Sequence, residues 1–425
     1  MTIKPLAQDH TVLYESPSPD DLYLGSPGLA RLPNGRLVAT FDFFGPGTDQ
    51  LPEPRMWRTF TNTYHQGKVF VSDDHGQSWT HKVDFPFLHA RPFAAGNSLY
   101  VLGLCNDLYI MGSHDGGETW TDPQPLTGYL EWTGAASNMH YANGCVYLAI
   151  EKRLDRGVQG WQVANIAPVV LRGRVSDDLT KPENWTFASD LVFMDVVNND
   201  DLNHIGVPFL EADRQKMTYP APKRGMAPIG WLETQVVQIV DPDHYWFDPS
   251  GRTLHLWARA HTGGTGYAAI AKVVEQGDQP GTGAMTTMLE AAPSGKSIVY
   301  VPCPGGQMKF HILYDEPSRL YWLLSTQTTN STIRAERLPD NRYGLPNNER
   351  RRLALHFSAN MMDWCFAGLV AVGESEKEAR HYASMVIDGD DLHVLSRSGD
   401  TRAHDAHNGN LITFHTISQF RHLIY

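Results

Sequence analysis

Three observations predict an all-β chain that folds as a six-bladed β-propeller. The 425 residues include 11 Trp, 17 Tyr and 17 Phe, and 37 Gly and 27 Pro separate many short apolar runs. This composition favours strands joined by turns. A hairpin pattern also recurs along the chain, and no long helical pattern interrupts it. We expect one propeller domain over residues 1–425 with a long insertion around 190–232; seven blades are the alternative, because that insertion has no assigned strands.

The first half of the repeat is a hairpin in which Gly, Asn, Asp or Pro-Ser forms the turn between two apolar runs. Such turns reverse a chain at low conformational cost. The last strand, 411–417, is expected to pair with residues 11–14 and so close the ring. Six copies of the hairpin are found, at residues 30–41, 92–102, 139–150, 245–257, 310–324 and 383–395.

The second half of the repeat is clearest at residues 72–79 and 113–120, which share the pattern Ser-x-Asp-x-Gly-x-Ser/Thr-Trp. Asp74 and Asp115 are 41 residues apart. In such a turn the Asp bonds backbone N–H groups, the Gly adopts a positive φ and the Trp covers the hairpin. We interpret these turns as structural, with weaker copies at 176–185 and 358–364.

Charge and apolar patterning exclude several classes of partner. A net charge of -12 repels a phosphate backbone, so we expect no nucleic acid partner. The first residues lack the apolar core of a secretory signal, and no run reaches ~18 apolar residues, so we expect no membrane partner. The chain as given reads as cytoplasmic, or as secreted or periplasmic if a signal was removed. Four cysteines without Cys-x-x-Cys spacing are expected to be buried apolar residues, not zinc ligands or disulfides: Cys105, Cys145, Cys303 and Cys365.

The loops and strand entrances on one face of a propeller are the places to look for a functional site. Glu233 stands at the entrance of one expected strand and Arg259 at the exit of the next, with a turn at 248–251 between them. We therefore expect the two charges to meet at the mouth of a pocket. The loops expected to wall that pocket are 43–67, 151–162, 259–267, 325–352 and 397–410.

These features together resemble the sialidase family. The Ser-x-Asp turn resembles the Asp-box repeat of sialidases and related propellers, and Glu233 precedes a Gln-Val-Val run as a sialidase Glu does. Arg259 falls where sialidases hold the substrate carboxylate, and Tyr382, in Arg-His-Tyr-Ala-Ser-Met, resembles the segment that carries their nucleophile. For the last arginine of the family we expect Arg351, from the run 350–352. The resemblance implies an exo-acting glycoside hydrolase.

The chemistry of these residues supports the same assignment. A phenol with a pKa near ~10 is a weak nucleophile at neutral pH, so a neighbouring carboxylate must take its proton. Glu233 is expected to do this for Tyr382. Arginine holds a substrate carboxylate by two parallel hydrogen bonds. The simpler interpretation is a core tyrosine, a solvated strand-end glutamate and a solvated arginine loop.

Two departures from the sialidase pattern point to another substrate. Sialidases begin with Phe-Arg-Ile-Pro, and this chain reads Leu-Gly-Ser-Pro, with Gly25 in place of an arginine of a three-arginine clamp. The general acid of the family has no clean match, and Asp42, Asp49 or a histidine are the candidates. We therefore expect a divergent enzyme that removes a different terminal sugar, also acidic, from a glycan.

Histidines and further arginines suggest a second mechanism on the same face. In a polysaccharide lyase, arginine neutralises a uronate while His or Tyr moves the proton. His89 with Tyr382 and Arg259 fits this scheme. A third interpretation is a carbohydrate-binding propeller without catalysis. The other substrate-binding candidates are Arg91, His261 and Arg380; His404 and His407 make no metal pattern, and we expect neither a metal nor a cofactor.

Overall fold

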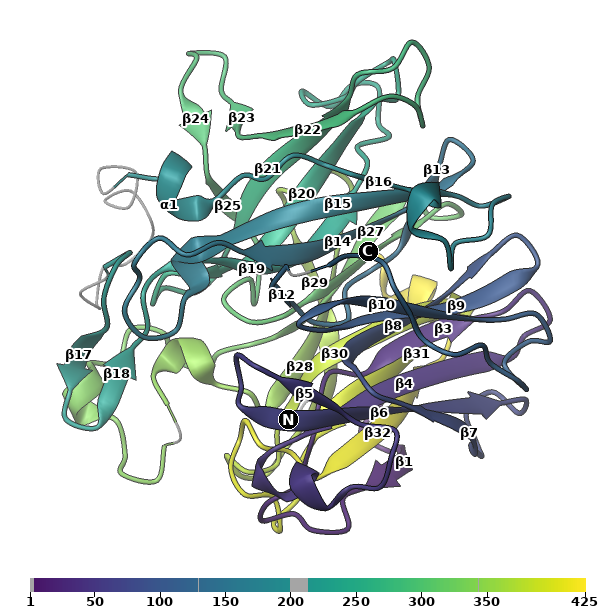
Figure 1. Ribbon diagram of the computed structural model, residues 1–425. Coiled ribbons are helices and arrows are strands. Elements are labelled where there is room, and N and C mark those ends of the chain that lie inside the picture. Colours follow the sequence, from purple (N-terminus) through teal and green to yellow (C-terminus); the bar gives the residue numbers. More distant parts are fainter. Residues whose placement is uncertain (1–3, 129, 199–212, 343) are drawn as a thin grey trace.

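The computed structural model describes residues 4–128, 130–198, 213–342 and 344–425. Within these ranges the fold is a six-bladed β-propeller, as Figure 1 shows, and the all-β prediction is confirmed. The seven-bladed alternative is wrong, because the described part of the expected insertion adds no blade. The helices in these ranges are α1 (Phe193–Val196) and the 3-10 turns η1 (Pro46–Gln50), η2 (Val163–Asn165), η3 (Pro182–Asn184), η4 (Ala335–Arg337), η5 (Pro346–Asn348) and η6 (Phe420–Leu423).

The first three blades follow one another along the chain, each running from its inner strand outward. Apolar runs separated by turn-forming residues make every blade an antiparallel meander, in which each strand pairs with the next. Their strands are β3 (Gly28–Arg31), β4 (Leu37–Phe44), β6 (Thr63–Ser72) and β7 (Thr80–Phe85); β8 (Leu88–Ala95), β9 (Ser98–Cys105), β10 (Asp107–Ser113) and β11 (Gln124–Pro125); and β13 (His140–Ala142), β14 (Cys145–Arg153), β15 (Ile166–Arg174) and β16 (Trp185–Phe187).

The remaining three blades repeat this order. Five of the six expected hairpins form the two inner strands of a blade, but the hairpin expected at 245–257 is wrong in its first half: residues 245–252 form no strand, and the inner strand of that blade is 230–237. Short extra strands extend three sheets: β2 (Tyr23–Leu24), β5 (Met56–Arg58), β12 (Trp132–Thr133) and β25 (Tyr300–Pro302). The strands of the last three blades are β19 (Gly230–Val237), β20 (Thr253–His261), β21 (Tyr267–Glu275) and β22 (Met285–Met288); β26 (His311–Asp315), β27 (Leu320–Thr326), β28 (Arg352–Ser358) and β29 (Cys365–Val372); and β30 (Arg380–Asp388), β31 (Asp391–Ser398), β32 (Leu411–Ile417) and β1 (Thr11–Glu15).

The ring closes where the two ends of the chain meet. The N-terminal strand β1 pairs antiparallel with β32, and Thr11 lies opposite Phe414. Figure 1 shows the purple β1 beside the yellow β32. The sixth sheet therefore takes its outer strand from the start of the chain, as the sequence predicts, and β32 is paired on both sides.

The two Ser-x-Asp turns have the expected local structure. Asp74 accepts hydrogen bonds from the Ser78 N–H at 2.9 Å and from the Ser78 hydroxyl at 2.5 Å. Gly76 has φ 83°, a conformation that glycine adopts without strain. Trp79 packs edge-on against Phe414 of the sixth blade, with ring centroids 5.3 Å apart. The first turn thus fastens its own hairpin and also contacts the next blade across the ring closure.

The expected insertion is described in part. Residues 199–212 lie outside the described residues, and on either side of them stand α1 and the hairpin of β17 (Thr218–Ala221) and β18 (Arg224–Met226). Figure 1 shows this hairpin projecting beside the propeller, and a second small hairpin pairs β23 (Glu290–Ala291) with β24 (Ser297–Ile298). Among the helices described, none has the length and apolar character to cross a membrane. The cysteines are free, and all but the partly exposed Cys365 are buried.

Candidate active site

Three inner strands carry the same irregularity at their entrances. His89 in β8, Glu233 in β19 and Tyr382 in β30 have φ values of 55°, 59° and 51°, and the strand register shifts at each of these residues. A positive φ is uncommon for residues other than glycine, and such strained positions cluster at functional sites. A bulge also turns a side chain out of the regular alternation of the strand. All three residues are candidates from the sequence.

Glu233 and Tyr382 meet from the fourth and sixth blades of the ring. The Tyr382 hydroxyl donates a hydrogen bond of 2.6 Å to Glu233 Oε1, within the reach expected from the sequence. Arg259 Nη1 lies 3.1 Å from the same hydroxyl oxygen and 3.3 Å from Glu233 Oε2. The arginine and the carboxylate are 1% and 3% exposed, so this contact takes place out of bulk water. The phenol therefore has a proton acceptor on one side and a cation on the other.

Burial and the Glu233 carboxylate raise the pKa of Tyr382, and the charges of Arg259 and Arg350 oppose that shift. The phenol is consequently neutral at neutral pH. It becomes a phenolate only if a base removes its proton, and Glu233 is the carboxylate in hydrogen-bond contact with it.

Two further arginines surround the Tyr382 ring. The guanidinium carbons of Arg350 and Arg397 lie 5.8 and 5.2 Å from the ring centroid, and both side chains are buried. Arg350 donates to His381 Nδ1 at 2.9 Å. In the sixth blade, Arg397 of β31 lies opposite His381, the residue before Tyr382. In the fourth blade, Arg259 of β20 lies opposite Leu232, the residue before Glu233, so the two arginines hold equivalent positions. Arg397 was not a candidate from the sequence. Its position near the end of the second strand of a blade matches that of Arg259, so the repeat could have indicated it.

Three residues expected to contact the substrate do not line the cavity beside Tyr382. Arg351 donates to the carbonyl of Glu374 at 3.2 Å on the exposed side of the loop, so Arg350 takes the place expected for it. Arg91 is buried, with Nη2 2.6 Å from the carbonyl oxygen of Ala135. Arg380 donates to the carbonyls of Ala379 and Gly399 at 2.8 and 2.7 Å. Arg91 and Arg380 thus satisfy backbone carbonyls instead of facing the cavity.

A cavity of about 290 Å³ opens above the Tyr382 ring. Arg259, Arg350 and His261 line it together with the imidazole of His407. Four of the five expected loops contribute, and the loop 43–67 contributes no lining residue. The remaining walls come from the insertion and from the other loops: Trp161, Met217, Gly225, Met226, Ala227 and Asn348.

The two histidines of the cavity are neutral. Burial, followed by the charge of Arg259, lowers the pKa of His261 to about 3. Burial and the charge of Arg397 hold the pKa of His407 well below its usual range. Around Tyr382 there are thus three guanidinium groups and one contacting carboxylate, so the local charge favours an anionic ligand. The arrangement suits a small molecule that carries a carboxylate.

The side chain of Asp42 occupies the space beside Gly25, so position 25 has no room for an arginine. A Cβ placed on Gly25 would come 2.0 Å from Asp42 Oδ2, so the carboxylate fills the space that any side chain at position 25 needs. Asp42 Oδ1 accepts the backbone N–H of His89 at 3.0 Å, and burial raises the pKa of Asp42 to about 7. The His89 imidazole lies 3.9 Å from the carboxylate, and neither side chain lines the cavity. Asp49, the other acid candidate, is exposed in η1.

Glu151 is a second buried carboxylate, and it lies close to Glu233. Its Oε1 accepts the backbone N–H of Thr234 at 2.7 Å, and burial raises its pKa to about 7. It does not line the cavity. Glu151 therefore supports the strand that carries Glu233 without contacting the Tyr382 hydroxyl.

Comparison with known proteins bears on the fold. No family model matches the chain, and no curated protein matches it. Among solved structures, a Trypanosoma rangeli sialidase mutant displaying trans-sialidase activity has 12% identity and a TM-score of 0.52, covering 99% of this chain and 60% of that one. A Hadza microbial sialidase has 13% identity, coverage of 96% and 68%, and a TM-score of 0.52. A protein of unknown function from Dyadobacter fermentans has 12% identity, coverage of 97% and 99%, and a TM-score of 0.52. The chain spans about 60% of the length of the trypanosomal sialidase.

Proposed function

We propose that the protein is a carbohydrate-active enzyme, an exo-acting glycoside hydrolase that removes a terminal sugar bearing a carboxylate. One observation carries the proposal: the Tyr382 hydroxyl is held between Glu233 and Arg259, 2.6 and 3.1 Å away, at the base of a cavity rich in arginine. The fold shared with two sialidases supports the class of reaction, although fold alone does not determine chemistry.

The first step forms a bond between the sugar and Tyr382. As the phenol oxygen attacks the anomeric carbon, Glu233 takes the phenolic proton and the bond to the leaving oxygen breaks. Arg259 stabilises the negative charge that develops on the phenol oxygen. In the second step water attacks the same carbon and gives a proton to the group that protonated the leaving oxygen. The bond from that carbon to the Tyr382 oxygen breaks, and Glu233 returns its proton to Tyr382. Two displacements at one carbon give retention of configuration.

The substrate carboxylate is assigned to the arginines that border Tyr382. Arg350 from the loop before β28 and Arg259 from β20 line the cavity. Arg397 from β31 approaches the Tyr382 ring without lining the cavity, and it donates to the carbonyl of His407. Guanidinium groups bind carboxylates by paired, charge-assisted hydrogen bonds. The third arginine beside Tyr382 is Arg397 of the sixth blade, whereas the arginine missing from the sialidase pattern would stand at Gly25. An acidic sugar is therefore compatible with the departure at Gly25.

Asp42 is the proposed general acid. An acid must be protonated near neutral pH in order to give a proton to the leaving oxygen. A pKa of about 7 places Asp42 in that range, and the hydrogen bond from the His89 N–H holds the carboxyl group near the strand entrances. Because Asp42 is buried and does not line the cavity, a bridging water must carry its proton to the leaving oxygen. His89 then acts as a positioning residue for the acid and not as a catalytic residue.

A uronate-directed lyase is the second candidate, because neutral His261 and His407 line the same cavity as Tyr382. In that reaction one of these groups removes the proton α to the carboxylate and another protonates the leaving oxygen. The product would be an unsaturated uronate with a characteristic ultraviolet absorbance.

The experiment is a screen of aryl glycosides of acidic sugars and of uronate polysaccharides with the wild-type protein and Tyr382→Phe. The hydrolase predicts release of an unmodified sugar and near-total loss of rate in Tyr382→Phe. Formation of the unsaturated product would establish the lyase instead. Ligand binding without any product would show a binding propeller, and full activity in Tyr382→Phe would contradict the assignment of the nucleophile.

A further inference from the structure

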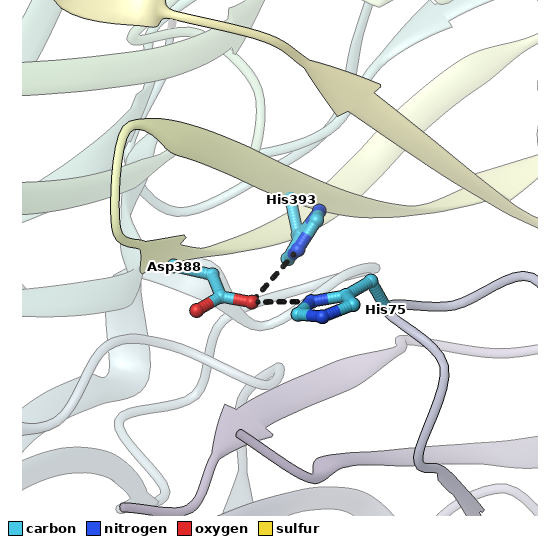
Figure 2. Close-up of side chains that lie close together, drawn as sticks. All are labelled: His75, Asp388 and His393. Carbon is cyan, nitrogen blue, oxygen red and sulfur yellow. Dashed lines mark hydrogen bonds and ion pairs between the residues drawn. The ribbon is translucent and has the colours of Figure 1, made fainter.

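On the face opposite the cavity, three metal-ligating side chains from two blades converge. His75 belongs to the first Ser-x-Asp turn, Asp388 ends β30 and His393 lies in β31. Their ligand atoms all lie within 4.8 Å of one another. Figure 2 shows both imidazoles directed at the same oxygen of Asp388. Asp388 is six residues beyond Tyr382 on β30, roughly 20 Å away at the rise of a strand, so this cluster is separate from the proposed active site.

The distances suit a small ion with few ligands. His75 Nδ1 lies 2.9 Å from Asp388 Oδ2, and His393 Nε2 lies 3.4 Å from the same oxygen. Ligands at 2.0 to 2.2 Å from a tetrahedral Zn²⁺ are roughly 3.3 Å apart, so the three atoms need only small movements to surround an ion. The 3.4 Å separation exceeds the usual length of an N–H···O hydrogen bond. The buried His393 Nε2 makes no hydrogen bond among the described residues.

The groups behind the three ligands hold them in the required orientation. His393 Nδ1 lies 3.1 Å from the hydroxyl of Thr416, so the ring presents Nε2 to the cluster. Arg31 Nε donates to the other oxygen of Asp388 at 2.5 Å, which leaves Oδ2 facing the imidazoles. Such outer contacts, with a partner on the second ring nitrogen and another on the carboxylate, accompany metal-binding residues.

We propose that His75, Asp388 and His393 bind one late first-row divalent cation, with Zn²⁺ as the favoured ion. Two imidazoles and one carboxylate suit Zn²⁺ and its neighbours, whereas Mg²⁺ prefers oxygen ligands only. Water completes the coordination, because the 68% exposed side chain of His75 leaves one side of the cluster open. This assignment revises the expectation of no metal, which rested on His404 and His407.

The position of the cluster gives the ion a structural effect. His75 comes from the first blade, and Asp388 and His393 come from the sixth, beside the sheet that β1 and β32 close. A bound ion would join residues 75 and 388, which are far apart in sequence but neighbours across the ring closure. Ion binding to the folded form alone raises the melting temperature, and chelation lowers it.

The test is a titration of chelator-treated protein with Zn²⁺ by calorimetry, with melting curves and with Mg²⁺ as a second ion. We expect one Zn²⁺ per chain, a higher melting temperature with Zn²⁺ and no effect of Mg²⁺. His75→Asn keeps a residue that tolerates positive φ and removes one ligand. Loss of a residue that only hydrogen-bonds a metal ligand weakens metal binding roughly 10- to 100-fold. Loss of the ligand His75 itself should therefore lower the affinity of His75→Asn for Zn²⁺ at least ~10-fold.

A matched control is His81→Ala. His81 lies in the same blade and also contacts an aspartate, Asp84, at 2.7 Å, but that pair has no third ligand among the described residues. His81→Ala should bind Zn²⁺ as the wild type does. Absence of Zn²⁺ binding in the wild type, or equal affinity in His75→Asn and the wild type, would overturn the proposal and leave a hydrogen-bonded contact between blades.

Discussion

Replacement of Glu233 by glutamine isolates its role as a base. The amide introduced by Glu233→Gln keeps an oxygen that accepts the 2.6 Å hydrogen bond from Tyr382, but that oxygen cannot take a proton at neutral pH. General base catalysis contributes about 10²- to 10⁴-fold to a rate. At 1.36 kcal/mol per tenfold change, the barrier rises by about 2.7 to 5.4 kcal/mol. We expect kcat to fall by that factor while KM changes little, because the arginines that border the cavity remain.

The same substitution also affects stability, and the assay must separate the two effects. Arg259 loses its ionic partner at 3.3 Å, and breaking a buried ion pair costs up to about 3 to 5 kcal/mol. Arg259 retains the carbonyl of Gln307, 2.8 Å from its Nε, and the Tyr382 hydroxyl, so the loss should lie below that range. Melting curves establish that the variant is folded at the assay temperature.

The assay is steady-state turnover of the acidic aryl glycoside found in the screen. Glu151→Gln is the control, because Glu151 is equally buried and lies in the neighbouring third blade but is bonded to the Thr234 backbone and not to Tyr382. It should keep the kcat of the wild type. A folded Glu233→Gln variant with kcat within about tenfold of the wild type would refute the role of Glu233 as the base.

Two further predictions follow from the charges around Tyr382. Arg350→Gln should weaken binding of the acidic substrate by about 10- to 100-fold, because a hydrogen bond to a charged group contributes about 1.5 to 3 kcal/mol, whereas Arg351→Gln should leave KM and inhibitor constants unchanged. Equal effects of the two changes would remove Arg350 from the site. Asp42 must be protonated to act, so kcat/KM should fall as pH rises through about 7, and Asp42→Asn should lack this limb. Because the pKa of Asp42 is higher in the folded state, this group stabilises the wild type fully below about pH 4, and that stabilisation is lost as pH rises through about 7. A melting temperature with the same pH dependence in Asp42→Asn would contradict the assignment.

The sequence is most informative where the repeat fixes the position of a residue. Glu233 and Tyr382 both open inner strands, and the count of modules places those strands in the fourth and sixth blades. Since inner strands of a propeller converge on its axis, residues 149 positions apart come to 2.6 Å. The same repeat predicts the pairing of β1 with β32.

The arginines show where sequence reasoning reaches its limit. Arg350 and Arg351 are neighbours, and which of them faces the cavity depends on the backbone of the loop before β28, where strand alternation does not apply. Arg91 stands two residues after His89, and the bulge at His89 shifts the register between them, so Arg91 contacts the carbonyls of the third blade. Local backbone geometry of this kind leaves no pattern in the sequence.

The metal cluster escapes prediction for a different reason. His75 is part of a Ser-x-Asp turn whose other residues explain its fold, and Asp388 and His393 are part of an ordinary hairpin. Ligands that come together only across the ring closure have no characteristic spacing. The sequence could suggest His404 and His407, which are close in the chain, but not a site built from the first and sixth blades.

The most direct test of the proposed chemistry is mass spectrometry of the enzyme quenched during turnover of an acidic glycoside whose leaving group departs rapidly. If Tyr382 attacks the anomeric carbon, the peptide that contains it carries the mass of the sugar, and Tyr382→Phe carries none. A sugar attached to another residue, or turnover without any attached sugar under conditions in which deglycosylation is the slow step, would contradict the proposal.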